Sequence, residues 1–111
     1  MSSLDLTFHA LSDPTRRRIL SQLAESETTI SDLAKPYKMS LQAVSKHLGV
    51  LRRAGLIQQR QQGRVRTCRL VGRPLEDATK WLVEYHRFWS EQLDSLASFL
   101  EAESDNENPM P

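Results

Sequence analysis

Apolar residues recur every three or four positions along most of this chain, which is the spacing of one face of an α-helix. The pattern predicts a short helix from Leu4 to Leu11 and a second helix that begins after Asp13. It predicts three more helices over residues of about 30–37, 40–54 and 74–101. The predicted buried positions of the three middle helices are Ile19, Leu20, Leu23, Ile30, Leu33, Ala34, Val44, Leu48 and Leu51.

Local signals mark the ends of these helices. Asp13, Thr29 and Ser40 are N-cap residue types at the predicted starts of the second, third and fourth helices. Asp32 follows Thr29 by three residues, as in a capping box. Gly55 follows the fourth helix and can adopt the left-handed conformation that ends helices.

A strand-like segment over residues 57–71 follows the fourth helix. Its β-branched and apolar residues lie on either side of Gly63, which predicts a hairpin with a polar tip that carries Arg60, Arg64 and Arg66. The third and fourth helices are joined by a very short turn, as in a helix-turn-helix motif. The predicted fold is therefore mainly α with a small β-hairpin: a winged helix-turn-helix of four helices, two strands and a fifth helix.

Charge is distributed unevenly along the chain. The net charge is +1, but residues 33–75 carry ten Lys or Arg and no acid, whereas residues 76–111 carry nine acids and two cations. A basic block that coincides with a structural motif is typical of a protein that binds a polyanion. A basic face that only aids solubility is the simpler alternative.

The fourth helix has the composition of a helix that reads DNA. A B-DNA major groove admits one α-helix, whose inner face packs on its domain while its outer face offers hydrogen-bonding groups to the bases. We expect Gln42, Ser45 and Lys46 to contact base edges and Ser40 to contact a phosphate. Arg52 is expected nearer the DNA backbone or solvent. His47 is expected to pack or to contact the backbone.

Three stretches carry a family resemblance: LSDPTRRRIL, MSLQAVSKHLGVLRRAGLI and GRVRTCRL. Together they resemble the ArsR/SmtB family of bacterial winged helix-turn-helix repressors, over residues from 5 to about 100. The resemblance implies a homodimeric repressor that binds an inverted-repeat operator in double-stranded DNA, and its own gene is a candidate target. The position of Leu41 is often Gln in that family, so base readout is expected to shift to Gln42.

Many members of that family sense metals, so the ligand positions matter. The third helix, where some members carry a cysteine cluster, has no Cys or His. In the last helix, Asp77 is followed by Thr79 where other members have a His. Neither ligand set is present, so we expect no metal and no other cofactor.

Two sensing alternatives stay open. A dimer could assemble His9 and His86 with Glu84 from both chains into a metal site. Cys68, the single cysteine, is expected to be a buried apolar residue, although Arg66 and Arg69 could lower its pKa and make it a thiol sensor.

The predicted last helix is the second functional element. It would run for about 28 residues, or roughly 40 Å, which exceeds what the preceding core covers. Its apolar stripe is expected to meet a second copy of the chain. Five of the seven aromatic residues lie in it. The predicted dimer contacts are Leu4, Phe8, Trp81, Tyr85, Phe88, Trp89 and Leu96. Residues 1–101 would form one DNA-binding and dimerisation domain, and residues 102–111 a disordered tail.

Other classes of protein fit the sequence less well. There is no catalytic triad, glycine-rich phosphate loop or paired catalytic carboxylates, so an enzyme is not expected. No segment has the length and apolarity of a membrane span or the pattern of a signal peptide, and a lone cysteine fits a cytoplasmic protein. A winged-helix module that binds RNA or another protein is the alternative from a different class.

Overall fold

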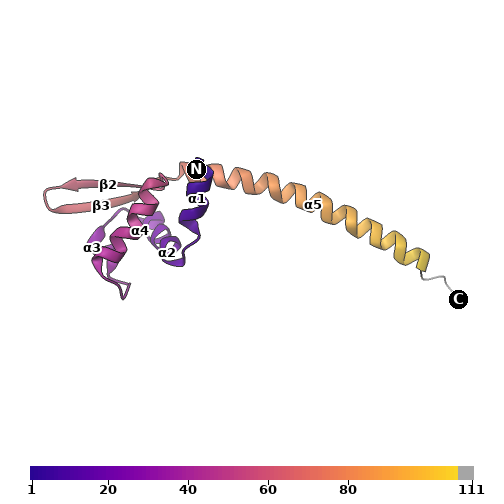
Figure 1. Cartoon of the computed structure of the whole chain (residues 1–111), viewed down its shortest axis with the longest axis horizontal. Helices are drawn as coiled ribbons and strands as arrows, with labels where there is room; N and C mark the ends of the chain where they lie inside the picture. Colours follow the sequence, from indigo (N-terminus) through magenta and orange to yellow (C-terminus); the bar gives the residue numbers. More distant parts are fainter. Residues whose placement is uncertain (108–111) are drawn as a thin grey trace. The chain divides into compact units, whose positions relative to one another are not determined.

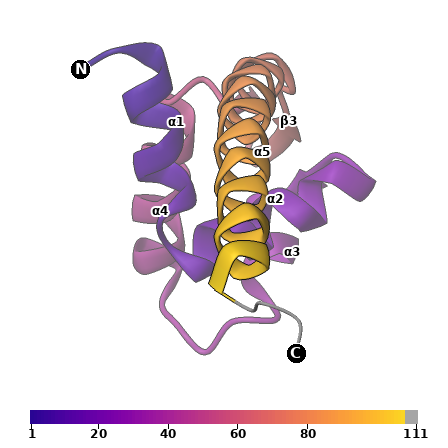
Figure 2. The same ribbon diagram turned by 90° about the vertical axis from the view of Figure 1, so that its right-hand side faces the viewer.

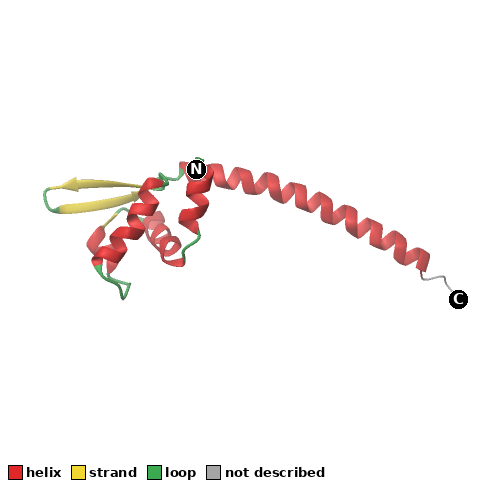
Figure 3. Cartoon of the chain, in the orientation of Figure 1, coloured by secondary structure: helices red, strands yellow, loops and turns green. Residues whose placement is uncertain are grey.

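The computed structural model describes residues 1–107, which contain five helices and three strands (Figures 1 and 3). This arrangement confirms the predicted fold class. Residues 1–78 form one compact unit and the chain from Thr79 onward a second. The elements are α1 (Ser3–Leu11), α2 (Pro14–Glu25), β1 (Thr28–Thr29), α3 (Ile30–Ala34), α4 (Leu41–Arg53), β2 (Ile57–Gln62), β3 (Val65–Leu70) and α5 (Arg73–Glu107).

The first unit is built around one apolar core. All the predicted inward positions of α2, α3 and α4 contribute to it, with Ala34 only partly buried. Helix α1 lies against α2 and α4 and buries Thr7 and Ala10 (Figure 2). Leu4 and Phe8 are half-buried. The core is completed from the sheet side by Leu56, Ile57 and Cys68.

The ends of α4 are fixed by local hydrogen bonds. The Ser40 hydroxyl accepts from the Ala43 backbone N–H at 3.1 Å, so Ser40 is the N-cap of α4, as predicted. At the other end, the Gly55 N–H donates to the Arg52 carbonyl and the Leu56 N–H to the Leu51 carbonyl. This pair of bonds is a Schellman motif, and Gly55 takes the left-handed φ of 74° that the motif requires.

The predicted hairpin is part of a three-stranded antiparallel sheet with strand order β1-β3-β2. Strand β1 has only two residues, too few to leave a periodic signal, so the sequence did not predict it. The hairpin register pairs Ile57 with Leu70 and Gln62 with Val65, which leaves a two-residue turn of Gly63 and Arg64. Gly63 has φ 60°, as expected for the first central position of a type II′ turn.

Two helices have different lengths from those predicted. Helix α3 ends at Ala34 instead of residue 37, because Pro36 has no N–H to continue the helical hydrogen bonds. Helix α5 runs to Glu107, past the predicted end at 101, since residues 102–107 contain neither Gly nor Pro. The predicted disordered tail is thus wrong for residues 102–107, and residues 108–111 lie outside the described residues. None of the described helices is long and apolar enough to cross a membrane.

The capping box predicted at the start of α3 is only half formed. The Thr29 hydroxyl accepts from the Asp32 N–H at 3.1 Å, as expected of an N-cap. The Asp32 carboxylate, however, pairs with Lys35 at 2.8 Å, and this partner is the main reason that the pKa of Asp32 is lowered. A complete capping box instead occurs at α1, between Ser2 and Asp5.

The left-handed conformation at Gly55 makes a stability prediction. Gly55→Ala should lower the free energy of unfolding by about 1–2 kcal/mol, because an L-residue resists a positive φ. Gly72→Ala is the matched control, since Gly72 has no positive φ and an added Cβ there meets nothing within 4 Å. Urea unfolding at a fixed protein concentration measures both variants, and equal losses would contradict the assigned role of Gly55.

Candidate nucleic-acid interface

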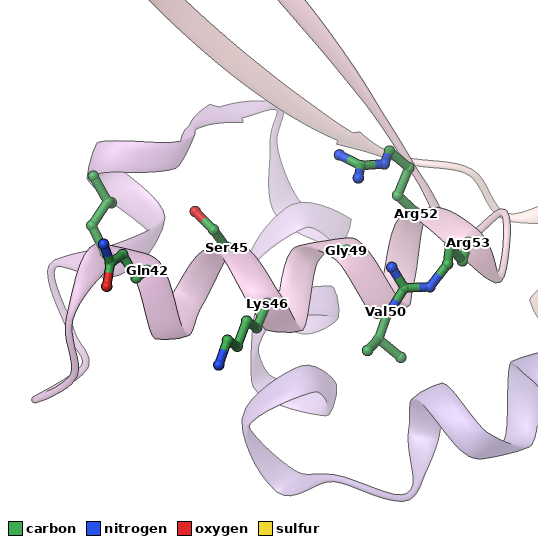
Figure 4. A pocket seen from close by; sticks show the side chains of 8 residues that line it. Gln42, Ser45, Lys46, Gly49, Val50, Arg52 and Arg53 are labelled. Atoms are coloured by element: carbon green, nitrogen blue, oxygen red, sulfur yellow. The ribbon is translucent and has the colours of Figure 1, made fainter.

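Helix α4 has one buried face and one exposed polar face. The buried side chains are Val44, Leu48 and Leu51, each with 0% exposure. Their burial fixes the rotation of the helix, so that Gln42, Ser45 and Lys46 are exposed on its outer side. Figure 4 shows these three side chains along a shallow hollow of about 640 Å³. The helix therefore offers amide, hydroxyl and ammonium groups to a partner.

Arg52 interacts with the hairpin as well as lining this hollow. Its Nη1 donates to the Gln59 Oε1 at 2.9 Å, which links the end of α4 to strand β2. In Figure 4, Arg52 lies on the hairpin side of α4, whereas Lys46 and Arg53 lie on the other side. The structure therefore gives Arg52 a bracing contact that its sequence position did not reveal.

His47 connects α4 to the start of α2. Its Nδ1 lies 3.7 Å from the Asp13 carboxylate and 3.4 Å from Nη1 of Arg16. Asp13 is also the N-cap of α2, and its pKa is lowered chiefly by the backbone N–H of Arg16 and also by the charge of His47 when that ring is protonated. His47 thus packs between helices, as expected from the sequence.

The three consecutive arginines of α2 make contacts inside the fold. Arg16 donates to the carbonyls of Ala10 and His9, and Arg17 donates to the carbonyl of Leu11 at 2.7 Å. Arg18 lies over the Tyr37 ring, 5.3 Å from its centroid. These contacts hold α1 and the turn after α3 against α2.

The hairpin separates the three predicted wing arginines. Only Arg64 lies in the two-residue turn, while Arg60 and Arg66 lie within the strands. Residues directly opposite each other in an antiparallel pair share a face, and alternation along β3 puts Arg66 on the face of buried Cys68. Arg60, opposite Thr67, is on the other face. The prediction that all three lie at the tip is therefore wrong for Arg60 and Arg66.

A hollow of about 350 Å³ lies where the hairpin meets the helix-turn-helix. Arg64 and Arg66 line it together with Leu41 and Ser45 of α4. Thr29, Ile30 and Ser31 of β1 and α3 also line it, although they were not predicted as site residues. Arg60 lines a different hollow that contains Glu27. The hairpin face that carries Arg66 thus lines the same hollow as the exposed residues Leu41 and Ser45 of α4.

Aromatic side chains follow one another along α5. The ring centroids of Trp81 and Tyr85 are 5.0 Å apart in a stacked arrangement, and those of Tyr85 and Trp89 are 5.9 Å apart. Phe88 also contacts Trp89 edge-on. These four side chains and Leu96 are exposed in a unit whose described part is a single helix.

The cysteine and histidines are dispersed. Cys68 is buried, and burial raises the pKa of its thiol against a smaller opposing effect of the Arg52 charge. Burial therefore disfavours the reactive thiolate. His9, His47 and His86 lie on α1, α4 and α5. In the part of the chain that the structure describes, no three His, Cys, Asp or Glu side chains are grouped so that they could hold a metal ion.

Sequence comparisons agree with this geometry. Residues 13–59 match the family model described as bacterial regulatory protein, arsR family. The HTH-type transcriptional regulator Rv2034 of Mycobacterium tuberculosis is 34% identical over 94% of each chain. The transcriptional repressor SdpR of Bacillus subtilis is 33% identical over 70% of this chain and 87% of its own length.

Solved structures of ArsR family regulators are also similar to this chain. The ArsR family transcriptional regulator RHA00566 superposes with a TM-score of 0.76 at 40% identity, over 80% of this chain and 98% of that one. The homodimeric winged helix-turn-helix DNA-binding domain of Mb0332 from Mycobacterium bovis gives a TM-score of 0.60 at 26% identity, over 84% of this chain and 83% of that one.

The separation of the wing arginines makes a binding prediction. Arg64→Ala and Arg66→Ala should weaken binding to all DNA duplexes alike, and each should reduce the slope of log K against log salt by about one unit. Arg60→Ala removes the same charge from the opposite face and should change this slope little. Fluorescence anisotropy titrations at several salt concentrations measure the slopes. Equal changes for all three variants would show that only net charge matters.

Proposed function

This chain belongs to the ArsR family of transcriptional regulators, and from that premise we propose that it is a homodimeric repressor that binds an inverted-repeat operator in double-stranded DNA. As a member of this family it is a regulator with a winged helix-turn-helix DNA-binding domain and not an enzyme. One observation carries the proposal: the outer face of α4 and the adjoining hairpin face expose hydrogen-bonding and cationic groups, and residues 33–75 contain no acid.

Base readout in this proposal rests on the first turns of α4. The N-terminal residues of a recognition helix enter the major groove most deeply. Gln42, Ser45 and Lys46 are exposed there, and a glutamine amide can pair with both hydrogen-bonding groups of an adenine edge. Ser40, whose oxygen already accepts from Ala43, would use its hydroxyl proton to contact a phosphate.

Dimerisation in this proposal rests on α5. Its exposed apolar positions 82, 85, 89, 93, 96 and 100 are spaced by three or four, which suits packing against another helix. Leu75 and Ala78 continue this spacing but belong to the first unit, where Leu75 packs against the core and Ala78 is buried. Leu4 and Phe8 of α1 would extend the same interface. The Mb0332 domain, which this chain resembles in fold, is homodimeric, and this supports dimerisation. A dimer is needed because two recognition helices must reach successive major grooves about 34 Å apart.

The charge distribution supports DNA binding by residues 33–75 and dimerisation by the last helix. Residues 76–111 carry nine acids and two cations, so phosphates would repel this part of the chain. The acidic segment is thus suited to the side of the dimer that faces away from DNA. The basic residues 33–75 supply the side that faces it.

Repression would follow from occupancy of an operator that overlaps a promoter, where the bound dimer excludes RNA polymerase. SdpR, which covers most of this chain, is itself a transcriptional repressor. The chain's own promoter is the first candidate target. The proposed repressor uses no metal ligands in α3, which has neither Cys nor His.

Footprinting on the intergenic DNA upstream of the chain's own gene tests the proposed function. We expect protection of an inverted repeat whose half-site centres are about 34 Å apart. Gln42→Ala should reduce the preference for this site over a random duplex by about 1–3 kcal/mol per lost base contact. Equal affinity for the operator, a random duplex and a single-stranded RNA would refute a sequence-specific operator and favour an RNA-binding module.

The proposed interface makes a separate prediction about assembly. Trp89→Ala should weaken the dimer by about 2 kcal/mol or more, or about thirtyfold, because large aromatics dominate such contacts. Operator affinity should fall as well, although no DNA-facing residue changes. Glu91→Ala is the control, since Glu91 follows Trp89 by two residues and therefore points roughly 200° around the helix from it.

Sedimentation equilibrium measures the monomer–dimer constant of each variant. We expect Glu91→Ala to sediment like the wild-type chain. A wild-type chain that stays monomeric at high micromolar concentration and binds a single half-site tightly would contradict the dimer.

A further inference from the structure

Leu41 places an exposed apolar side chain at the start of α4. It is the first residue of α4 and is 55% exposed, whereas Val44, three positions later, is fully buried. Its surroundings are mixed, since Gln42, Ser45 and Arg66, but also Ile30, Val50 and Val65, line the same hollows. The exposed part of this side chain is therefore available for contact with a partner.

The rotation of α4 about its axis determines which partner groups Leu41 can contact. The buried face of the helix is fixed by three core residues, and Leu41 lies with Gln42 and Ser45 at the exposed N-terminal turn. It lines both the hollow along α4 and the hollow between α4 and the hairpin. Leu41 is thus at the centre of the face that we assign to DNA.

The chemistry of the major groove supplies one apolar group at the base edges: the 5-methyl of thymine. A leucine at the end of the helix that enters the groove most deeply can exclude water from that methyl, but it cannot hydrogen-bond a base. We propose that Leu41 is a specificity-determining residue that contacts a thymine 5-methyl in each operator half-site. This inference rests on the proposed operator binding.

In this proposal, neighbouring residues recognise different bases by different kinds of contact. Leu41 would select thymine through apolar contact, while Gln42 would read an adjacent base through hydrogen bonds. The cations of the hairpin would bind phosphates without sequence preference. The contributions of Leu41 and Gln42 can therefore be separated by changing the DNA one methyl group at a time.

The experiment first selects an operator from a pool of random duplexes with the full-length chain. Each thymine of the selected repeat is then replaced by deoxyuridine, symmetrically in both half-sites, which removes only the 5-methyl. We expect one position to lose about fourfold in affinity per half-site, hence about fifteenfold for both. Other thymine positions should change little.

Protein variants assign that loss to its residue. Leu41→Ala and Leu41→Gln should bind the thymine and deoxyuridine operators equally at this position. Both replacements favour helix at an exposed site, so the fold should be retained. Gln42→Ala should bind both operators more weakly and still prefer thymine about fifteenfold.

The outcomes separate the two proposals. A selected inverted repeat with no methyl effect, or a methyl effect that persists in Leu41→Ala, overturns the role of Leu41 and leaves the operator binding intact. A pool from which no sequence is enriched overturns both. A methyl effect lost in Gln42→Ala and kept in Leu41→Gln would assign the contact to Gln42 and overturn this inference.

Discussion

The burial of Val44, Leu48 and Leu51 determines which side chains α4 presents on the surface that we propose binds DNA. These side chains fix the rotation of α4 about its own axis. The Ser40 cap and the Schellman motif at Gly55 fix where the helix begins and ends. Once the rotation and the ends of α4 are fixed, Gln42 and Ser45 must lie on its exposed side. The polar face is therefore a consequence of core packing.

The cations of the chain do two different kinds of work. Arg16 and Arg17 donate to carbonyls at the end of α1, and Arg52 donates to Gln59 of the hairpin. These contacts hold helices and sheet together around α4. Lys46 and Arg64 are exposed on the side assigned to DNA. A bracing set of arginines thus keeps the second set in position, which links the stability of the fold to the binding surface.

The second unit adds a separate physical requirement. A long helix with aromatic side chains in contact along one stretch presents more apolar surface than a lone helix leaves in water. Its acids and the basic block before it have opposite signs. A second copy of the chain would cover the apolar surface and would also supply the second recognition helix that a two-fold operator requires.

The fold class, the three buried positions of α4 and its caps at Ser40 and Gly55 could be read from the amino-acid sequence, because the signals that mark each element lie within one or two helical turns. Periodicity and capping are local, so they can be read along the chain. The family resemblance rested on the same local pattern and was confirmed by the comparisons.

The sequence could not show which wing arginines lie beside α4, since that depends on the register between β2 and β3 in the folded chain. The pairing of the two-residue β1 and the contact of His47 with Asp13 were also decided there, because these partners are far apart in sequence. Arg52 and Gln59 are only seven residues apart, but their contact also depends on tertiary structure, because Gln59 lies in strand β2 and its position depends on how the hairpin packs against α4. Local sequence fixes which side chains an element offers, whereas the packing of distant elements fixes which of them remain available to a partner.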